Sequence, residues 1–428
     1  ISACLVGSEM CIRDSPWVVQ SWFASLVYGL AYRLGGAVLG SGARLQSVVV
    51  LQGALMAILG LLVARLARTG VAVRTMASAG IASLLGALYW SPRPLIFGLL
   101  GLVLLITVVE HEAPGWWLLP IAWAWVNTHG SFPLGFAWLL AMLLGQSLDS
   151  RRADGATLRY LTWFAGGCLL ACINPIGPRL LTFPFTVQSK ASVFKNVVEW
   201  HSPNFQTKDG LAALLLLALA LLIICRSRLT WADTLPAVGF VALALLSLRN
   251  VAPAAIVLAP VLGHALRPAS PSEVTPVTDR LRQRLNRLIA AALVGIAMLL
   301  LVLSVLSSGL DLSTYPVDAE AWMSGHGLLD PLRHRVATQD VVGCYLILVR
   351  GTAGRVFIDD RVDMYPVAVS RAYDALLLGS PASPDVLSRY SIDTVLWDKR
   401  LPLVDLLVRE GGWHKAYEDR RWAVLERT

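Results

Sequence analysis

The sequence predicts an α-helical polytopic membrane protein, with about 10–11 transmembrane or membrane-embedded helices and a C-terminal extracytoplasmic α/β domain. The 428 residues are 56% hydrophobic and have a mean hydropathy of +0.62. These values are far above those of a soluble domain of this size. Apolar blocks separated by short arginine-bearing loops fill the chain up to about residue 308, and a more polar segment, 309–428, follows them.

Ten apolar blocks, rich in Leu, Ala, Val and Gly, make up the predicted membrane domain, 16–308. Most of them approach the roughly 20 residues that a helix needs to cross a bilayer. The shorter blocks are expected to be tilted, broken or buried among the others. The blocks are 45–63, 76–90, 95–109, 116–128, 131–148, 160–174, 210–225, 231–248, 251–266 and 288–308.

The N-terminal residues 1–15 differ in character from the blocks. The run from Ala3 to Ser15 resembles translated sequencing-library adapter and is treated as a non-native artefact. We therefore expect native sequence upstream of Trp17. The segment that follows, 17–38, either spans the membrane or lies in its plane, because Arg33 and several aromatic side chains also suit the interface.

Arginine content divides the loops into two alternating sets, and short cytoplasmic loops are enriched in Lys and Arg. The rich set holds Arg65, Arg68, Arg74, Arg151, Arg152, Arg159, Arg226, Arg228, Arg267, Arg280, Arg282, Arg284 and Arg287. The poor set holds only Arg44, Arg93 and Arg249. We expect the rich set in the bacterial cytoplasm, so that block 288–308 runs outward and the tail is extracytoplasmic. If 116–128 and 131–148 form one span, everything upstream inverts.

The net charge of +8 has an ordinary cause in this topology. The arginines of the cytoplasmic loops account for much of it. The sequence therefore predicts membrane lipids as partners and no nucleic acid, and it leaves the oligomeric state open.

A long loop, about 175–209, lies on the predicted outer side. It carries lysines at 190, 195 and 208 among Phe and Trp side chains, a mixture that suits the headgroup layer. One interpretation is an interfacial helix that anchors the bundle. The other is a lid in which Lys190 and Lys195 bind a lipid phosphate as point charges. Glu199, Trp200 and His201 add a carboxylate and an imidazole, which are side chains used in acid–base chemistry.

A second polar cluster, 123–131, interrupts sequence of membrane depth. Burying Asn127 and His129 in hydrocarbon is costly unless they have partners or face a cavity. They belong either to a capped turn or to a polar cavity that opens outward. Arg93 falls on the same predicted side, where it is either a snorkelling anchor or a phosphate clamp. Asn250 joins this side as well.

Metal and cofactor chemistry are not expected. Glu110, His111 and Glu112 are adjacent, so their side chains do not converge on one ion from a helix. Cys168 and Cys172 are spaced i,i+4 within a span, which is typical of packing.

The tail, 309–428, shows the alternation of strands and helices that is typical of a layered α/β sheet. The predicted strands are Val341–Val349, Arg355–Ile358 and Asp393–Trp397, with a closing hairpin of 413–418 and 421–426. The predicted helices are Val367–Leu378, Pro384–Tyr390 and Leu403–Arg409.

The densest polar motif of the tail contains Asp359, Asp360, Arg361 and Asp363. Carboxylates at the end of a strand bind cations or sugar hydroxyls in some proteins. They can equally cap the next helix and pair with Arg361. Both alternatives stay open at this point.

Six motifs carry a resemblance to a group of bacterial polytopic membrane proteins, and it covers nearly all of 16–428. They are Trp17–Phe23, Arg93–Phe97, Trp125–Phe132, Asn174–Gly177, Glu199–Pro203 and Phe357–Tyr365. This group is similar in layout to the C-type membrane glycosyltransferases, including the dolichyl-phosphate-mannose–protein mannosyltransferase-like clan. The resemblance implies transfer of a sugar from a polyprenyl-phosphate donor to a cell-envelope acceptor on the outer face of the membrane.

The resemblance also bears on the site. The catalytic carboxylate of such enzymes usually lies in the first outward loop, a region that this chain lacks, so no catalytic residue is carried over. For substrate binding we expect phosphate contacts from Arg93, Lys190 and Lys195, and a cavity lined by Asn127, His129, Glu199, Trp200 and His201. The alternative is a non-enzymatic transporter or an envelope-assembly scaffold, although no internal repeat of the kind common in transporters is visible.

Overall fold

The computed structural model describes residues 20–40, 44–69, 72–87, 93–151, 154–189, 198–226, 229–267, 312–361 and 365–428, and isolated positions between 284 and 303. The chain forms two compact units. One is a helical bundle built from Val19–Thr186 and Val197–Ser308, and the other contains the tail, Gly309–Thr428. The chain is therefore mostly α-helical with a small C-terminal sheet.

The bundle consists of helices that coincide with nine of the ten predicted apolar blocks. They are α4 (Arg44–Leu66), α5 (Ala72–Ala87), α6 (Leu95–Glu110), α7 (Leu118–Thr128), α8 (Pro133–Ser150), α9 (Gly155–Leu170), α12 (Lys208–Arg226), α13 (Trp231–Leu246) and α14 (Val251–Ala265). The described part of the bundle also contains the α-helices α3 (Trp22–Leu39) and α10 (Arg179–Ser189) and the short 3-10 helices η2 (Gly115–Trp117), η3 (Val198–Trp200) and η4 (Leu248–Asn250). Most of the block 288–308 lies outside the described residues.

Side-chain oxygens cap the N-termini of two of these helices. Asp154 accepts a hydrogen bond from the backbone nitrogen of Thr157 at 2.9 Å, and Thr230 accepts one from Asp233 at 3.2 Å. Such caps satisfy amide groups that have no partner in the first turn of a helix. After α9, the side chain of Asn174 accepts from the backbone nitrogen of Gly177, whose φ of +72° suits glycine. This turn redirects the chain into α10.

Contacts between loops show that the two loop sets lie at opposite ends of the bundle. At the first end, which we call the Arg-rich end, Arg65 donates to His111 at 3.1 Å and the side chain of Arg74 reaches the carbonyl of Leu266. At the second end, the Arg-poor end, Arg93 meets Glu199. Helix α6 connects the two ends, because it begins beside Arg93 and ends beside His111.

Helices α7 and α8 are two separate, oppositely directed elements. Tyr160 donates to the carbonyl of Ala113, just before α7, and Asp149 near the end of α8 accepts from the backbone nitrogen of Trp231. Both contacts lie at the Arg-rich end, so α7 leads away from that end and α8 returns to it. The turn between them, around His129, lies at the Arg-poor end.

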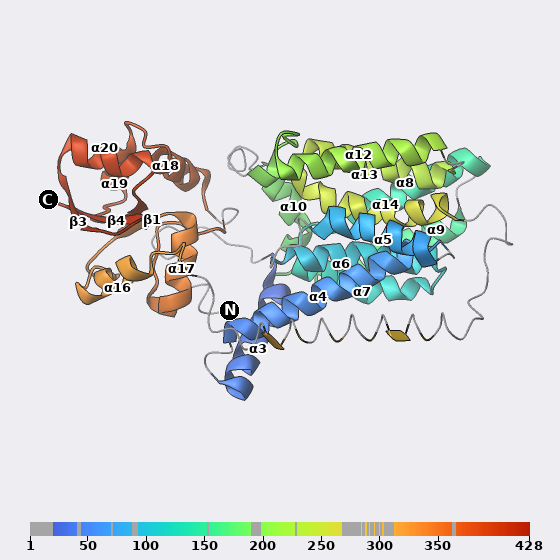
Figure 1. The fold of residues 1–428 in the computed structure, drawn as a ribbon, viewed down its shortest axis with the longest axis horizontal. Helices are drawn as coiled ribbons and strands as arrows, with labels where there is room; N and C mark the ends of the chain where they lie inside the picture. The colour runs from blue at the N-terminus through green and yellow to red at the C-terminus, as the bar shows by residue number, and fades with distance from the viewer. Residues whose placement is uncertain are drawn as a thin grey trace. The chain divides into compact units, whose positions relative to one another are not determined.

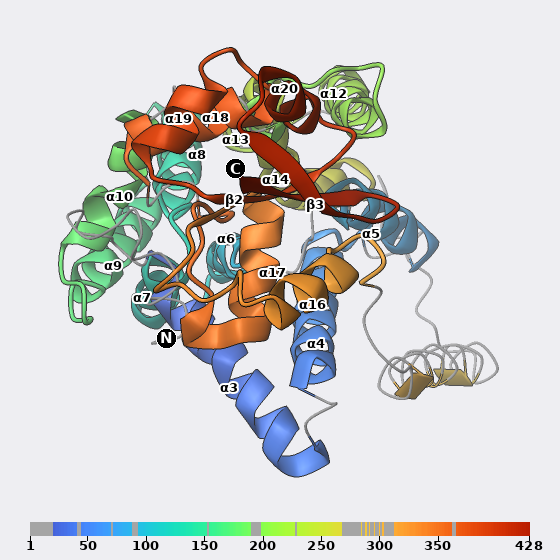
Figure 2. The same cartoon turned by 90° about the vertical axis from the view of Figure 1, so that its left-hand side faces the viewer.

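Helix α3 crosses the direction of the other helices. Figure 1 shows it nearly perpendicular to the bundle, and Figure 2, viewed along the bundle, shows it lengthwise while α12 appears end on. One face of α3 leaves a stripe of apolar side chains exposed at a spacing of four residues: Leu26, Leu30, Leu34 and Val38.

Two helices of the described part are long and apolar enough to cross a membrane, namely Arg44–Leu66 and the continuous segment Leu248–Ala265. Three shorter apolar helices are Leu95–Glu110, Gly210–Cys225 and Trp231–Leu246. Within the 18-residue apolar window of each long helix, 17% of the first and 78% of the second is buried. The first therefore lies at the periphery of the bundle and the second lies at its centre.

The tail contains a four-stranded sheet in the order β1-β2-β4-β3. Its elements are α16 (Val317–Gly325), β1 (Val336–Thr338), α17 (Asp340–Arg350), η6 (Gly351–Ala353), α18 (Val367–Leu377), α19 (Ser383–Arg389), β2 (Thr394–Asp398), α20 (Pro402–Glu410), β3 (Trp413–Glu418) and β4 (Trp422–Arg427). Strands β1 and β2 are parallel, with Ala337 opposite Val395, and the other two pairings are antiparallel. The predicted helices of the tail, its strand at 393–397 and its hairpin are confirmed.

Two predicted strands are wrong. The run Val341–Val349 lies in helix α17, and Arg355–Ile358 is not part of the sheet. The apolar, β-branched composition of 341–349 favours a strand, but the buried positions 342, 343, 345 and 346 follow the period of a helix. Gly343 also fits closely under the backbone of Ile358, where a Cβ would meet the carbonyl group. Tertiary packing therefore overrides the local preference.

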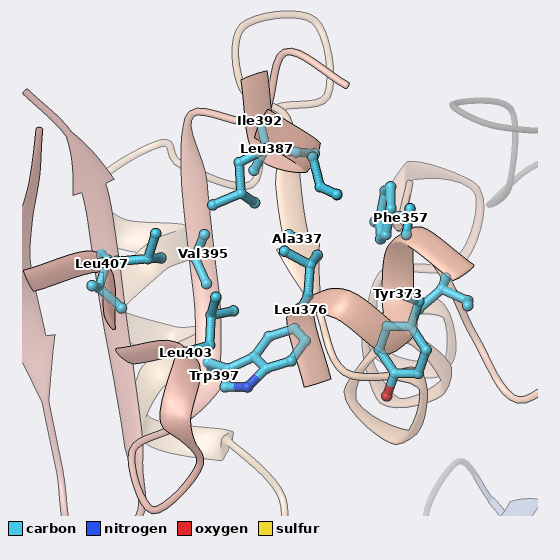
Figure 3. Close-up of a cluster of buried hydrophobic side chains, with 14 of the residues drawn as sticks. Ala337, Phe357, Tyr373, Leu376, Leu387, Ile392, Val395, Trp397, Leu403 and Leu407 are labelled. Carbon is cyan, nitrogen blue, oxygen red and sulfur yellow. The ribbon is translucent and has the colours of Figure 1, made fainter. Parts of the chain in front are cut away.

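The core of the tail lies between its sheet and the helices α18, α19 and α20. Figure 3 shows Trp397 and Val395 of β2 facing Leu376, Leu387 and Leu403 from these helices. All of these side chains are almost fully buried. Because this core is built from residues of the tail alone, the tail is a domain with its own source of hydrophobic stabilisation.

Asp398 at the end of β2 is held by two arginines. Its carboxylate accepts from Arg400 at 2.6 Å and from Arg421 at 2.8 Å, and only 5% of its side chain is exposed. The hydrogen bond from Arg400 and then that from Arg421 hold the pKa of Asp398 well below its usual range, although burial acts in the opposite direction.

We expect the tail to lose stability in acid through Asp398. A carboxyl whose pKa is depressed by folding stabilises the fold above its unfolded pKa of about 3.9. This contribution, on the order of 2 kcal/mol, is lost progressively as the pH falls from that value through the lower pKa of the folded state, so part of it is lost at pH 3. Thermal unfolding of segment 309–428 at pH 7 and pH 3 measures it. Asp398→Asn should lower the stability at pH 7 and flatten the acid loss, whereas Asp405→Asn should leave both unchanged.

Candidate functional site

The Arg-poor end of the bundle gathers polar side chains from four places along the chain. The start of α6 supplies Arg93, and the turn between α7 and α8 supplies His129. Helix η3 supplies Glu199 and Trp200, and η4 supplies Arg249. These five residues are far apart in sequence, and helices that begin or end at the same end of the bundle bring them together.

Arg93 and Glu199 form an ion pair at this end. The Nη1 atom of Arg93 lies 2.6 Å from Oε1 of Glu199, and about half of each side chain is exposed. An exposed pair of this kind contributes only about 0–1 kcal/mol. The pair can therefore exchange for a stronger anionic partner, because a guanidinium forms bidentate, charge-assisted hydrogen bonds with phosphate.

Arg249 provides the second guanidinium of the site. Its Cζ atom lies 4.3 Å from the centre of the Trp200 ring, which is the geometry of a cation–π contact. Hydrogen bonds join the segments that carry the two residues: Ser247 donates to the carbonyl of Glu199 at 3.0 Å, and Leu248 donates to the carbonyl of His201 at 3.0 Å. The short helices η3 and η4 are thus fixed against each other, with Arg93 paired to Glu199 and Arg249 over the ring of Trp200.

His129 is held in one tautomer. Both the backbone N–H and the hydroxyl of Ser131 lie within hydrogen-bond distance of its Nδ1 atom, at 3.2 and 2.8 Å. The hydroxyl also accepts from the indole N–H of Trp125 at 3.0 Å. Nδ1 is therefore an acceptor, which places the proton of the neutral ring on Nε2. Gly98 makes room for this arrangement, since a Cβ there would overlap Ser131 and lie 2.8 Å from Nδ1.

The neutral form of His129 is strongly favoured. Desolvation of the ring, followed by repulsion from Arg249, lowers the pKa of His129 to about 3. The imidazole therefore stays uncharged at physiological pH. It can offer an Nε2 hydrogen-bond donor, but it cannot supply a positive charge to an anion.

Asn127 lies below the surface of this end. It is fully buried, and its side chain is satisfied on both sides. Trp22 donates to its Oδ1 at 2.8 Å, and its Nδ2 donates to the carbonyl of Trp123 at 2.8 Å. Gln20 reaches the neighbouring carbonyl of Val126 at 3.4 Å. Asn127 thus connects the start of α3 to α7, and it supports the site from beneath.

The remaining predicted bundle residues are placed only in part. His201 is exposed, and its carbonyl accepts from η4. Lys190 and Lys195 lie outside the described residues. The structure therefore brings together Arg93, Glu199, Trp200 and His201 at one end with His129, and it places Asn127 behind them.

The polar cluster of the tail is organised by a local ion pair. The side chain of Asp359 is 1% exposed and is paired with Arg361, whose Nε donates to it at 2.9 Å. The backbone nitrogen of Asp360 donates to Cys344, and that of Asp359 donates to the hydroxyl of Tyr365. Asp363 lies outside the described residues. The ion pair between Asp359 and Arg361 is therefore present, as in the alternative in which these carboxylates have a structural role.

A further polar cluster, which the sequence did not predict, lies at the Arg-rich end. Nδ1 of His264 lies 3.3 Å from Asp233, and its Nε2 lies 3.8 Å from Glu110. These residues come from α14, α13 and α6. Among the described residues no group of three His, Cys, Asp or Glu side chains is arranged to hold a metal ion. The cluster instead ties three helix ends together.

Two residues that support the site, Trp22 and Ser247, were not predicted from the sequence. Trp22 was not singled out within 17–38, and it is the partner of Asn127. Ser247 was not singled out, although it fixes η3. The buried Asn127 was the available signal, because a buried amide requires partners.

Comparison with protein-family models and with curated proteins gives no match to this chain.

Proposed function

We propose that the chain is a polytopic protein of the bacterial cytoplasmic membrane that transfers a sugar from a lipid-phosphate donor to a cell-envelope acceptor on the outer face. The observation that carries this proposal is the convergence of Arg93 and Arg249 on Glu199 and Trp200 at the Arg-poor end of the bundle. Two guanidiniums beside an aromatic ring form a suitable site for the phosphate of a lipid-linked sugar.

The exposed surface of the bundle supports a membrane location. Large apolar side chains point outward from nearly every helix, and examples that are at least half exposed are Leu61, Met76, Leu84, Leu144, Leu169, Leu215 and Leu222. A soluble protein rarely exposes apolar side chains on this scale. In a bilayer the same surface meets lipid tails and has no hydration cost.

The arginine distribution supports the orientation. Positive loops favour the cytoplasmic side, so we assign the Arg-rich end to the cytoplasm and the Arg-poor end to the outer face. A donor carried by a polyprenyl chain would then approach the site from the outer leaflet. Helix α3, with its exposed stripe of Leu and Val, would lie in the interface beside this site.

Each residue of the site has a role in this proposal. Arg93 and Arg249 bind the donor phosphate and stabilise the charge that develops on it as the glycosidic bond breaks. His129 donates from Nε2 as a neutral group, and Trp200 packs against the donor. Lys190 and Lys195 are proposed as further phosphate contacts of the same loop. A base that accepts the proton of the acceptor hydroxyl completes the reaction.

A transfer assay tests the proposal. Membranes containing the chain are incubated with polyprenyl phosphate that carries a radiolabelled sugar, and loss of label from the lipid and its appearance in envelope glycan are measured. We expect transfer that falls at least tenfold in the Arg249→Ala variant. If the wild-type chain binds the donor and leaves it intact, a lipid-binding transporter or scaffold replaces the enzyme.

A further inference from the structure

The tail contains a cavity of about 160 Å³, roughly ten times the space that one water molecule requires. It lies beside the carboxyl ends of the parallel strands β1 and β2. Gln339 and Asp340 follow β1 directly, and Arg421 is bonded to Asp398, the last residue of β2. In α/β sheets, ligands usually bind at this edge.

Polar atoms with remaining hydrogen-bond capacity line this cavity. Gln339 accepts from the backbone of Asp398 through Oε1 at 3.3 Å, and its Nε2 makes no hydrogen bond to another described residue. The carboxylate of Asp340 accepts from the neighbouring amide of Val341 at 2.8 Å and lies beside the hydroxyl of Tyr373, and no cation of the described tail pairs with it. Arg421 uses Nε and Nη1 for Asp398 and the carbonyl of Thr314, so that Nη2 remains. The cavity thus offers two donors and one strong acceptor.

Two aromatic side chains complete the lining. Tyr315 is half-buried and packs against Tyr345 with ring centres 5.4 Å apart, so its ring is held in place. Trp422 is buried, and the guanidinium of Arg421 lies over its ring at 5.0 Å. The cavity therefore combines a fixed aromatic surface with donors and an acceptor at its wall.

We infer that this cavity binds a single sugar residue through Tyr315, Gln339, Asp340 and Arg421. A pyranose ring has an apolar face that packs on an aromatic side chain, and its hydroxyls both donate and accept hydrogen bonds. The carboxylate of Asp340 disfavours a phosphate or another anion by repulsion. An apolar ligand would leave the polar atoms of Gln339 and Asp340 without partners, which is costly. The inference goes beyond the proposed transfer reaction, because the site is in the tail and does not depend on catalysis.

The test measures saturation transfer by NMR from the full chain in nanodiscs to the methyl glycosides of glucose, galactose, mannose and N-acetylglucosamine. We expect transfer to at least one glycoside. Binding should weaken about tenfold in each of two variants. Asp340→Asn removes the charged acceptor, and Tyr315→Leu removes the aromatic surface. Gln339→Glu keeps the bond to Asp398 and removes the Nε2 donor, so it should weaken binding as well.

Matched variants separate this site from other causes. Asp385→Asn removes a carboxylate from the first turn of α19, as Asp340→Asn removes one from the first turn of α17, and it should leave binding unchanged. Arg93→Ala should also leave it unchanged, so that failure of the transfer proposal is distinguishable from failure here. The inference is overturned if no glycoside receives saturation from the wild type at 10 mM, or if the Tyr315 and Asp340 variants bind as the wild type does.

Discussion

Replacing Arg249 with alanine is expected to weaken the binding of polyprenyl phosphate by at least about tenfold, and the Arg93→Ala, Arg249→Ala double variant by about a hundredfold. Each guanidinium supplies charge-assisted hydrogen bonds to phosphate, which are worth about 1.5–3 kcal/mol each. Arg249 contacts the Trp200 ring, and among the described residues Arg93 has the exposed Glu199 as its ion-pair partner. Binding of a fluorescent polyprenyl phosphate to the purified chain in nanodiscs measures the change.

A substitution that keeps the positive charge tests whether the shape of the guanidinium group contributes to phosphate binding. Arg249→Lys should recover only part of the affinity, because an ammonium group neither forks onto phosphate nor stacks on an indole as a guanidinium does. Lys190→Ala and Lys195→Ala are expected to weaken binding less than the arginine variants. Arg159→Ala, which changes an arginine of the rich set, is the control. Unchanged binding in all of the Arg93, Arg249, Lys190 and Lys195 variants would remove the phosphate assignment.

Gly145→Ala is expected to destabilise the bundle, because the added methyl group would collide with backbone atoms of a neighbouring helix. Gly145 of α8 faces the start of α13, where a Cβ would lie 2.5 Å from the carbonyl carbon of Trp231 and 2.6 Å from the Cα of Ala232. These are backbone atoms, so the helices must separate. One turn later, Asp149 accepts from the backbone nitrogens of the same two residues at 3.0 and 3.1 Å, and these bonds would be strained. Overpacking of this kind costs about 1–3 kcal/mol.

Thermal unfolding of the chain in detergent measures this effect, which corresponds to a fall in Tm of roughly 5 °C. Gly239→Ala is the matched control, because Gly239 lies in α13 with nothing within 4 Å of an added Cβ. Alanine there should preserve or slightly raise the Tm, since it favours the helix. Equal Tm values for the two variants would contradict the close packing of α8 on α13.

Composition and periodicity predicted most of the helices. The apolar blocks coincide with helices of the bundle because a long run without turn residues has few alternatives. Helix α9 begins earlier than its block, 160–174, because Asp154 caps it from outside the apolar run. In the tail, Val341–Val349 was assigned to a strand from its β-branched composition. Its helical state depends on packing against residues distant in the chain, such as Ile358, which local sequence does not show.

The candidate site was predictable in composition more than in geometry. The arginine count assigned Arg93, the loop of Glu199 and Asn250 to one side, and the structure places them at one end of the bundle. The sequence did not predict which of these side chains form ion pairs, because Arg93 and Glu199 are separated by 106 residues. The sequence did not predict the stacking of Arg249 on Trp200 either. Asn127 adjoins the turn between α7 and α8, and its hydrogen bond with Trp22 was not predicted.

Photo-crosslinking tests the central claim most directly. A polyprenyl phosphate with a diazirine beside its phosphate is added to the chain in nanodiscs, irradiated, and the labelled peptides are identified by mass spectrometry. The account predicts labels within 93–98, 198–204 and 247–251, all of them reduced in the Arg93→Ala, Arg249→Ala double variant. Labels confined to the Arg-rich end, around 229–233 and 264–267, or spread evenly over the lipid-facing helices, would contradict it.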